Sequence, residues 1–360
     1  MAQLTYNSYG VLPMTANLIN PTSRPSFTSQ EVIELYASGT RNFGLANMTG
    51  ADLSGSNLSG AYLGGVRLSK ANLSGANLRK VNFTGASLSG ANLSGADLRG
   101  ADLTEAHLNW ADLNGANLTG ALLPKADISG ANLSSANLNG TNFTGAYLIG
   151  ANLQQADLTQ ANLSQASLNK ADLSGTKLIE ANLTGAKLKQ ANLTGVDATR
   201  AKMTRANLKQ ANLSQAHLNW ADLVQADLTE TNFTQANLSK ANLSNTDLTT
   251  ACLNRANLAG INLSGANLTQ VDLSQKLMTG SNLSGANLTM GNLSGAYLIQ
   301  ANLSGATLIR ANLTKSHLMN TNLSGADLRQ ADLSKANVMQ TNLKDAQVKG
   351  MVLPSGKIHA

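Results

Sequence analysis

Charged and aromatic residues are scarce in this 360-residue chain, at 13% and 4% of the sequence. A two-layer globular domain of this length usually carries more of both. The chain has one cysteine, so no disulfide forms within it. The first twenty residues lack a basic start and a continuous apolar stretch, and no run approaches the about 20 apolar residues of a membrane span. We therefore expect a cytoplasmic protein with no signal peptide and no transmembrane segment.

Residues that carry chemistry are few and scattered. The histidines His107, His217, His317 and His359 lie far apart in the sequence, so none has the spacing of a metal site. Cys252 has no nearby histidine to act as its general base. The glycines recur singly along the chain and do not form a phosphate-binding loop. The sequence therefore predicts no enzyme, no catalytic or metal site, and no cofactor.

One five-residue pattern is abundant, and it runs from Arg41 to Gly350 without insertion. Its consensus is Ala-Asn/Asp-Leu-Ser/Thr-Gly, and we number its positions one to five. Position three is apolar and mostly leucine, position one is mostly small, and position two is mostly Asn or Asp. This small-polar-large alternation indicates a short strand, and the last two positions suit a turn. The pattern lacks the period of about 3.6 residues that an amphipathic α-helix requires.

A unit of this kind buries its leucine only if the chain coils and stacks on itself. Successive coils then lie about 4.8 Å apart, with positions one and three inside and position two outside. Outward Asn side chains are expected to form stacked amide ladders. Burial of each leucine contributes about 1.5–3 kcal/mol, before the entropy cost of ordering the chain. A period of five residues alone does not distinguish three sides per coil from four.

The stretches ANLSGADLRGADL (91–103) and SNLSGANL (281–288) resemble the pentapeptide repeat family, whose motif is A-(D/N)-L-x-x. In style the chain is similar to the long cyanobacterial members. The resemblance implies an all-β fold: a right-handed quadrilateral parallel β-helix of about 15 coils, each of four pentapeptides. It also implies that residues 20 apart in sequence stack in one column.

The chain divides into four predicted segments. These are a flexible tail (1–26), a helical N-terminal cap (27–40), the β-helix (41–353) and a C-terminal turn and strand cap (354–360). Caps are needed because an open coil is an edge strand. Thr28 and Glu31 have the spacing of a capping box, Phe27 and Val32 that of a hydrophobic staple, and Gly39 is a stop signal. These signals predict a helix over residues 29–38.

Two neighbouring outward columns near the C-terminus are unusually apolar. We name these residues the C-terminal strip: Leu277, Tyr297, Ile299, His317, Met319 and Met339. A contiguous apolar surface favours an interface, and chance alignment is the alternative. Lys276 directly precedes the strip at an inward position, where a lone ammonium is costly. Either this side of the coil distorts or Lys276 extends outwards, and the strip loses its lower edge if Leu277 turns inward.

Two further groups of residues are candidates for contact. A possible basic patch consists of Lys187, Lys189, Arg200, Lys202, Arg205 and Lys209. Its alternative interpretation is a set of solvated cations. The octapeptide AHLNWADL occurs twice and places Trp110 and Trp220 at corners, where each is expected to be exposed. Exposed tryptophans are often contact residues, although local duplication also explains the repeat.

These features favour a non-enzymatic scaffold that binds an unidentified protein partner or forms a homodimer through its C-terminal half. A DNA mimic that binds gyrase is a rival hypothesis, which the net charge of +6 and the lack of inserted loops disfavour. A regulatory accessory protein of a transport or stress pathway is a second rival, and an ice-binding surface is a third. Aromatic residues do not alternate with the basic ones, so we expect no specific nucleic acid partner.

Overall fold

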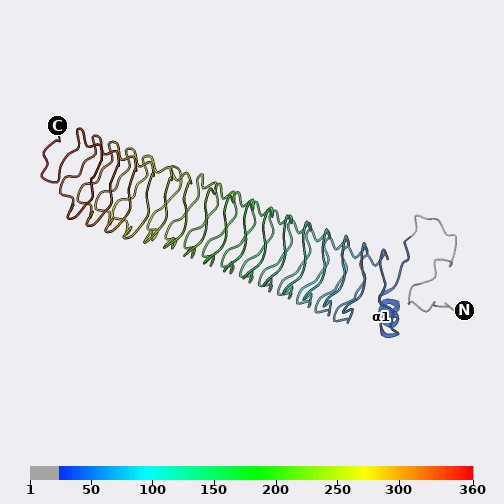
Figure 1. Ribbon diagram of the computed structural model, residues 1–360. Coiled ribbons are helices and arrows are strands. Elements are labelled where there is room, and N and C mark those ends of the chain that lie inside the picture. The colour runs from blue at the N-terminus through cyan, green and yellow to red at the C-terminus, as the bar shows by residue number, and fades with distance from the viewer. Residues whose placement is uncertain (1–23, 360) are drawn as a thin grey trace, which may run out of the picture. The chain divides into compact units, whose positions relative to one another are not determined.

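The computed structural model describes residues 24–359 of the chain. The chain forms two compact units, Met1–Ala171 and Asp172–Ala360, and each is described by itself. Helix α1, Ser29–Ala37, belongs to the first unit (Figure 1). All other regular structure in the described residues consists of turns and isolated bridges, nearly all of them between residues of the repeats.

Within each unit, successive coils pair in parallel at a spacing of 20 residues. In the first unit Asn72 pairs with Asn92, and in the second unit Asn242 pairs with Asn262. A coil therefore consists of four pentapeptides, which settles the choice between three sides and four. Each bridge involves only one residue per side, so the paired segments are shorter than the predicted short strands. The right-handed sense and the number of coils stay predictions.

The corner between two sides is encoded by the repeat itself. In the unit that contains Asn72, the amide of Ala76 donates to the carbonyl of Leu73 (3.1 Å) and closes the turn. The Asn72 side chain accepts a hydrogen bond from the Ser74 amide (3.2 Å). Gly75 has φ +63°, a left-handed conformation that glycine adopts without steric cost. The sequence Asn-Leu-Ser-Gly thus satisfies its own backbone at each turn.

The interior of each unit is a continuous stack of position-three side chains. Leu73 and Phe83 in the first unit and Leu243 and Phe233 in the second are completely buried. On the outer surface, Asn92 donates to Asn72 (3.2 Å) and Asn262 donates to Asn242 (2.8 Å). The predicted amide ladders are therefore confirmed along these columns.

Helix α1 covers the first coil, as its sequence signals predict. The Glu31 amide donates to the Thr28 hydroxyl (3.3 Å), and the Thr28 amide donates to the Glu31 carboxylate (2.7 Å). The hydrogen bond from the Thr28 backbone holds the pKa of Glu31 below its usual range. Val32 is fully buried, and Tyr36 donates its hydroxyl proton to the Ser59 carbonyl (2.7 Å). The helix ends one residue earlier than predicted.

The predicted tail and the first coil meet before Phe27. The Asn47 amide donates to the carbonyl of Pro25 (2.8 Å), and Ser26 pairs in parallel with Asn47. These two residues of the predicted tail are therefore paired with the coil, because the coil edge offers them a free amide. Residues 1–23 of the predicted tail lie outside the described residues.

The C-terminal end of the second unit is only partly covered. Val352 pairs antiparallel with Ile358, and the Leu353 amide donates to the Lys357 carbonyl (2.7 Å). This turn does not shield the whole terminal coil. The position-three residue Leu343 is 36% exposed, and Val348 is half-buried, whereas interior leucines are completely buried. The terminal coil of the second unit therefore presents apolar side chains to solvent.

Candidate functional site

The six residues of the C-terminal strip form two adjacent columns in the second unit. Leu277, Tyr297 and His317 are joined in sequence by parallel bridges. In the neighbouring column the Gln300 amide donates to the Met319 carbonyl (2.9 Å). In the same way the Gly280 amide donates to the Ile299 carbonyl (2.9 Å), and the Asn320 amide donates to the Met339 carbonyl (3.0 Å).

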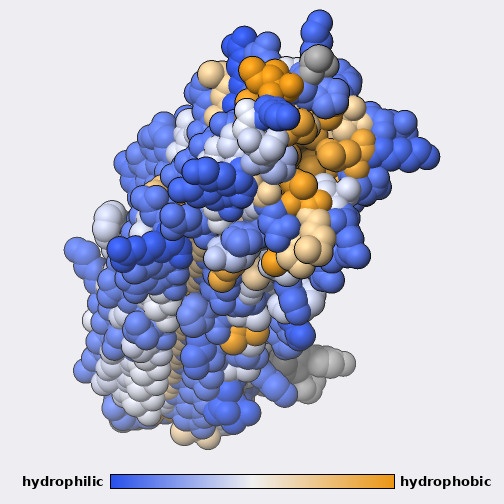
Figure 2. Space-filling view, turned by 90° about the vertical axis from the view of Figure 1, so that its left-hand side faces the viewer, coloured by the Kyte–Doolittle hydropathy of each residue, from blue (hydrophilic) through white to orange (hydrophobic). Residues whose placement is uncertain are grey.

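Three residues of the strip are exposed, and the other three, Ile299, His317 and Met319, are half-buried. Leu277 and Met339 at its two ends are 57% and 60% exposed, and Tyr297 is 38% exposed. The Tyr297 and His317 rings stack with centroids 4.4 Å apart and planes 9° apart. Figure 2, which faces the C-terminal end, shows hydrophobic side chains gathered in a patch bordered by hydrophilic residues. The axial pairing and the ring stacking thus bring the residues of the strip together on one surface.

The Lys276 side chain reaches the backbone of the preceding coil, and the pairing of its side of the coil is interrupted. Its ammonium donates to the Leu253 carbonyl (2.8 Å), and its side chain is half-buried. Burial lowers the pKa of Lys276 from its ordinary value. Met278 takes the inward position and is completely buried, so Leu277 stays outside. Leu277 therefore remains part of the C-terminal strip, as its first residue.

The axial pairing is interrupted beside Lys276, along a line that we name the seam (residues 252–257 against 272–277). In this part of the described chain no bridge joins Cys252 to Asp272 or Asn257 to Leu277. The Leu253 and Leu277 amides also lack the backbone hydrogen bond that other repeats make at these positions. Ala256 and Val271 are 6% and 7% exposed, so the core is slightly open here.

The six residues of the predicted basic patch occupy two neighbouring sides of the coil. Lys187 pairs with Asn207, which places Lys187 on the side that also carries Lys189 and Lys209. Lys202 pairs with Asp222, on the next side, and the corners of that side carry Arg200 and Arg205. Arg200 also forms an ion pair with Glu180 (3.6 Å). The structure does not bring the six cations together on one side.

The two tryptophans lie at corners, and both are exposed as predicted. Trp110 is 73% exposed and lies over Gly130, where an added Cβ would come within 2.5 Å of the indole ring. Trp220 is 55% exposed, and the Lys240 ammonium sits 4.5 Å from its ring centroid. Each tryptophan therefore packs on the corner of the next coil in its own unit.

The histidines and the cysteine are not gathered into a reactive centre. Among residues 24–359, no group of three or more His, Cys, Asp or Glu side chains could hold a metal ion. Cys252 is half-buried, and its sulfur lies 3.4 Å from the Thr234 hydroxyl. Within the described part of the chain no helix is long and apolar enough to cross a membrane.

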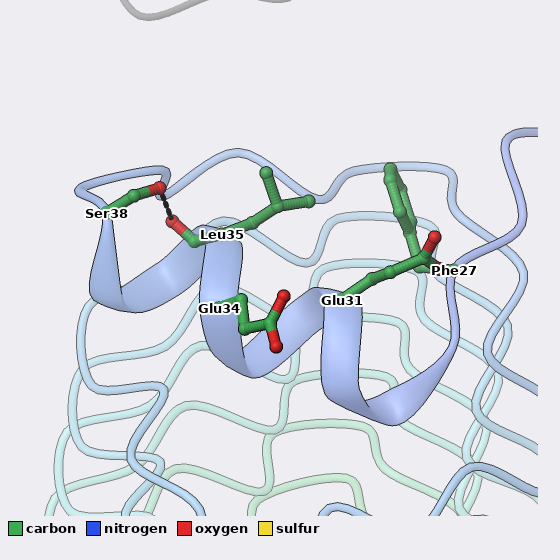
Figure 3. A pocket seen from close by; sticks show the side chains of 5 residues that line it. All are labelled: Phe27, Glu31, Glu34, Leu35 and Ser38. Atoms are coloured by element: carbon green, nitrogen blue, oxygen red, sulfur yellow. Dashed lines mark hydrogen bonds between the residues drawn. The ribbon is translucent and has the colours of Figure 1, made fainter. Parts of the chain in front are cut away.

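Two surface hollows have no counterpart in the sequence analysis. The first lies against α1 (Figure 3) and is lined by Phe27, Glu31, Glu34, Leu35 and Ser38. Both of its carboxylates are engaged, because Glu31 completes the capping box and Glu34 accepts a hydrogen bond from Gln30 (2.7 Å). The second hollow lies in the second unit and is lined by Thr289, Met290, Ile309, Arg310, Arg329 and Gln330. In the sequence, the one indication of this hollow is the apolar residue Ile309 directly followed by the basic residue Arg310.

The twenty-residue coil and its corner turns agree with a comparison against protein families. The profile of the family described as pentapeptide repeats matches the chain in successive segments between residues 46 and 345. The chain therefore belongs to the pentapeptide repeat family. No curated protein sequence matches it significantly.

Solved structures of the same family are similar to this chain. HetL from the cyanobacterium Nostoc, involved in the regulation of heterocyst differentiation, is 28% identical over 92% of this chain and 100% of its own (TM-score 0.26). A second Nostoc pentapeptide repeat protein is 42% identical over 29% of this chain and 84% of its own (TM-score 0.27). QnrB1, a plasmid-mediated fluoroquinolone resistance protein, is 18% identical over 50% of this chain and 86% of its own (TM-score 0.39). These TM-scores are low, and the family assignment rests on the repeat profile.

Proposed function

We propose that the protein is a non-enzymatic scaffold that associates with another protein, or with a second copy of itself, through the C-terminal strip. Proteins of the pentapeptide repeat family are in general repeat scaffolds rather than enzymes. The observation that carries the proposal is the contiguous apolar surface from Leu277 to Met339, on a fold whose other outward positions are mostly polar. Exposed patches of this kind mark interaction sites in proteins that are otherwise polar outside.

Two properties of the strip support protein binding. Met319 and Met339 have flexible, polarizable side chains that adapt to a partner surface. Met339 lies in the last full coil, next to the partly uncovered position-three residues Leu343 and Val348. An uncovered coil edge also offers unpaired backbone groups for strand addition. A second copy would cover both surfaces at once, which favours self-association through this end.

The test replaces Met319 and Met339 together by aspartate and compares oligomeric state by sedimentation velocity and light scattering. We expect the wild type to self-associate and the variant to be monomeric, because two carboxylates in the strip would have to be desolvated. The control replaces Leu122 and Ile149, each 44% exposed in the first unit, by aspartate. An unchanged oligomeric state in the strip variant, with no bound partner lost from the native cell extract, would remove the proposal.

A gyrase-binding role is the distinct second candidate, because the similar protein QnrB1 is a fluoroquinolone resistance protein. Mimicry of DNA requires a negative surface, whereas this chain has a net charge of +6 and runs without an inserted loop from Arg41 to Gly350. We therefore expect no inhibition of gyrase-catalysed supercoiling by the purified protein. Inhibition at micromolar protein would favour the gyrase-binding role over the scaffold.

A further inference from the structure

The hollow in the second unit lies half a coil away from the C-terminal strip. Its residues belong to two adjacent columns at the fourth and fifth positions of the repeat. The Met290 amide donates to the Ile309 carbonyl (2.9 Å), and the Arg310 amide donates to the Arg329 carbonyl (3.0 Å). The hollow is therefore built on the regular part of the coil, where the backbone pairing is intact.

The floor of this hollow is apolar and its rim is cationic. Met290 is 50% exposed, and Ile309 beside it is half-buried. Arg310 donates from Nε to the Gln330 side-chain oxygen (2.7 Å), which orients its guanidinium. No other side-chain hydrogen bond of Arg310 occurs in the described part of the chain, so its terminal amino groups stay available to a ligand.

The second arginine on the rim is held in place by its own carboxylate. Arg329 donates from Nε to Asp327 (2.9 Å) and from Nη2 to the other oxygen of the same carboxylate (2.7 Å). These hydrogen bonds hold the pKa of Asp327 below its usual range, so Asp327 stays ionised and neutralises Arg329. Lys349 lies next in the Arg329 column, since the Gln330 amide donates to its carbonyl (3.1 Å). Arg310 therefore leaves the rim with a net positive charge, and Lys349 adds a second positive charge from the next coil.

We propose that this hollow binds an acidic segment of a partner protein in which an apolar side chain adjoins a carboxylate. The apolar side chain rests on Met290 and Ile309, and the carboxylate accepts hydrogen bonds from Arg310. A guanidinium offers two parallel donors that match the two oxygens of a carboxylate. The methionine floor adapts to the shape of the apolar group. A neutral peptide of the same shape lacks the group that Arg310 would bind.

The experiment follows the Met290 methyl group by NMR in full-length protein labelled at methionine methyls. The Met290→Leu variant assigns its resonance. The probes are acetyl-Leu-Glu-amide and its neutral isostere acetyl-Leu-Gln-amide, with inorganic phosphate as a third probe. We expect the acidic peptide to shift the Met290 signal with at least about fivefold higher affinity than the other two probes. Equal affinity of the neutral peptide or of phosphate would overturn the proposal.

Two variants make the test specific for this hollow. Arg310→Gln is expected to lower the affinity of the acidic peptide at least about fivefold. Arg205→Gln is the matched control, because Arg205 occupies the same repeat position and donates from Nε to Gln225 (3.0 Å) in the same way. An equal loss in both variants would mean that only net charge attracts the peptide, and the proposal would be wrong.

The proposal for the hollow and the proposal for the C-terminal strip can be tested independently of each other. The strip variant, with Met319 and Met339 replaced by aspartate, is expected to bind the acidic peptide with unchanged affinity. Arg310→Gln is expected to leave the oligomeric state unchanged. Loss of peptide binding in the strip variant would show that the peptide does not bind at Arg310, which would contradict the inference.

Discussion

An inward polar side chain is tolerated at the residue scale when its polar atom reaches a carbonyl of the preceding coil. The Thr141 hydroxyl donates to Leu118 (3.0 Å), and the Thr321 hydroxyl donates to Leu298 (2.7 Å). Lys276 makes the same contact with Leu253, in the same sequence relation of 23 residues. Threonine makes this bond without a charge or a long stem, whereas the lysine brings an ammonium into a half-buried position. Lys276 thus makes the equivalent hydrogen bond to Leu253 at a higher desolvation cost.

Replacement of Lys276 by threonine is therefore expected to stabilise the second unit. We expect the free energy of unfolding to rise by about 1–2 kcal/mol, because the hydroxyl keeps the hydrogen bond and the partly buried charge is removed. Urea denaturation measures the change. The control is Lys202→Thr at an exposed outward position, where a change within about 0.5 kcal/mol is expected. A destabilised Lys276→Thr protein would contradict this account.

The same pair of proteins tests the protonation of Lys276. Burial lowers the pKa of Lys276 below its ordinary value of 10.5. Between the folded pKa and 10.5, the unfolded chain binds a proton that the folded chain has released, so the stability of the wild type rises with pH in this window. The advantage of Lys276→Thr over the wild type is expected to shrink between pH 7 and pH 10. An advantage that grows over this range would show the opposite shift of the pKa.

The corner turn is the element that the repeats share. Its fifth position is left-handed in glycine and in most other residues, with the β-branched Thr250 as an exception. Gly115 has φ +63°, and Gln165 and Trp110 each have φ +60°. A side chain in this conformation crowds its own backbone, which costs about 1–2 kcal/mol per residue. A residue other than glycine in this conformation at the fifth position therefore adds strain, and the burial of the adjacent leucines offsets this strain.

Gly115→Ala isolates the strain of the corner. A Cβ at Gly115 would meet no atom within 4 Å, so a loss of stability would come from the dihedral angle alone. We expect thermal or urea unfolding to show a loss of about 1–2 kcal/mol. The reverse change, Gln165→Gly, is expected to stabilise the first unit. Unchanged stability in both variants would show that the corner carries no strain.

At the scale of the whole molecule, each coil contacts only its neighbours, so stability is a sum of local terms along the chain. In the second unit the axial hydrogen bonds are interrupted at the seam beside Lys276. They are also interrupted between the described residues 226–230 and 246–250, where the Leu228 and Asp247 amides lack the backbone bond of other repeats. A break in this pairing lowers the free energy of local opening on either side of it. The seam is thus one of two weak links in the interior of the second unit, and it adjoins Leu277 at the N-terminal end of the C-terminal strip.

Amide hydrogen exchange tests this weak link. The Leu248 and Gly260 amides, which are hydrogen-bonded at 3.0 and 3.1 Å beside the seam, are expected to exchange about tenfold faster than the Leu193 amide, bonded at 2.7 Å. Lys276→Thr is expected to slow exchange at Leu248 and Gly260 and to leave Leu193 unchanged. Uniform exchange at the three amides would show that the seam does not open.

Much of the site was predictable because residue number alone assigns columns once a coil contains 20 residues. The strip and the exposed tryptophans follow from this rule. The hollow beside Arg310 does not follow from it, because its shape depends on how Gln330 and Asp327 orient two flexible arginines. The sequence analysis also did not predict the open terminal coil. The residues that form the Val352–Ile358 pair indicate a C-terminal cap, but they do not indicate how much of the terminal coil the cap covers.

The sequence by itself determines which side chains face inward, because alternation within a five-residue unit leaves only positions one and three for the interior. It also determines the corners, because Asn side chains and left-handed glycines satisfy the turn locally. Only the tertiary structure decides that four units close a coil, because a period of five residues is compatible with three sides or four. It alone decides the fate of Lys276, because the carbonyl that receives its ammonium belongs to Leu253, a residue of the preceding coil.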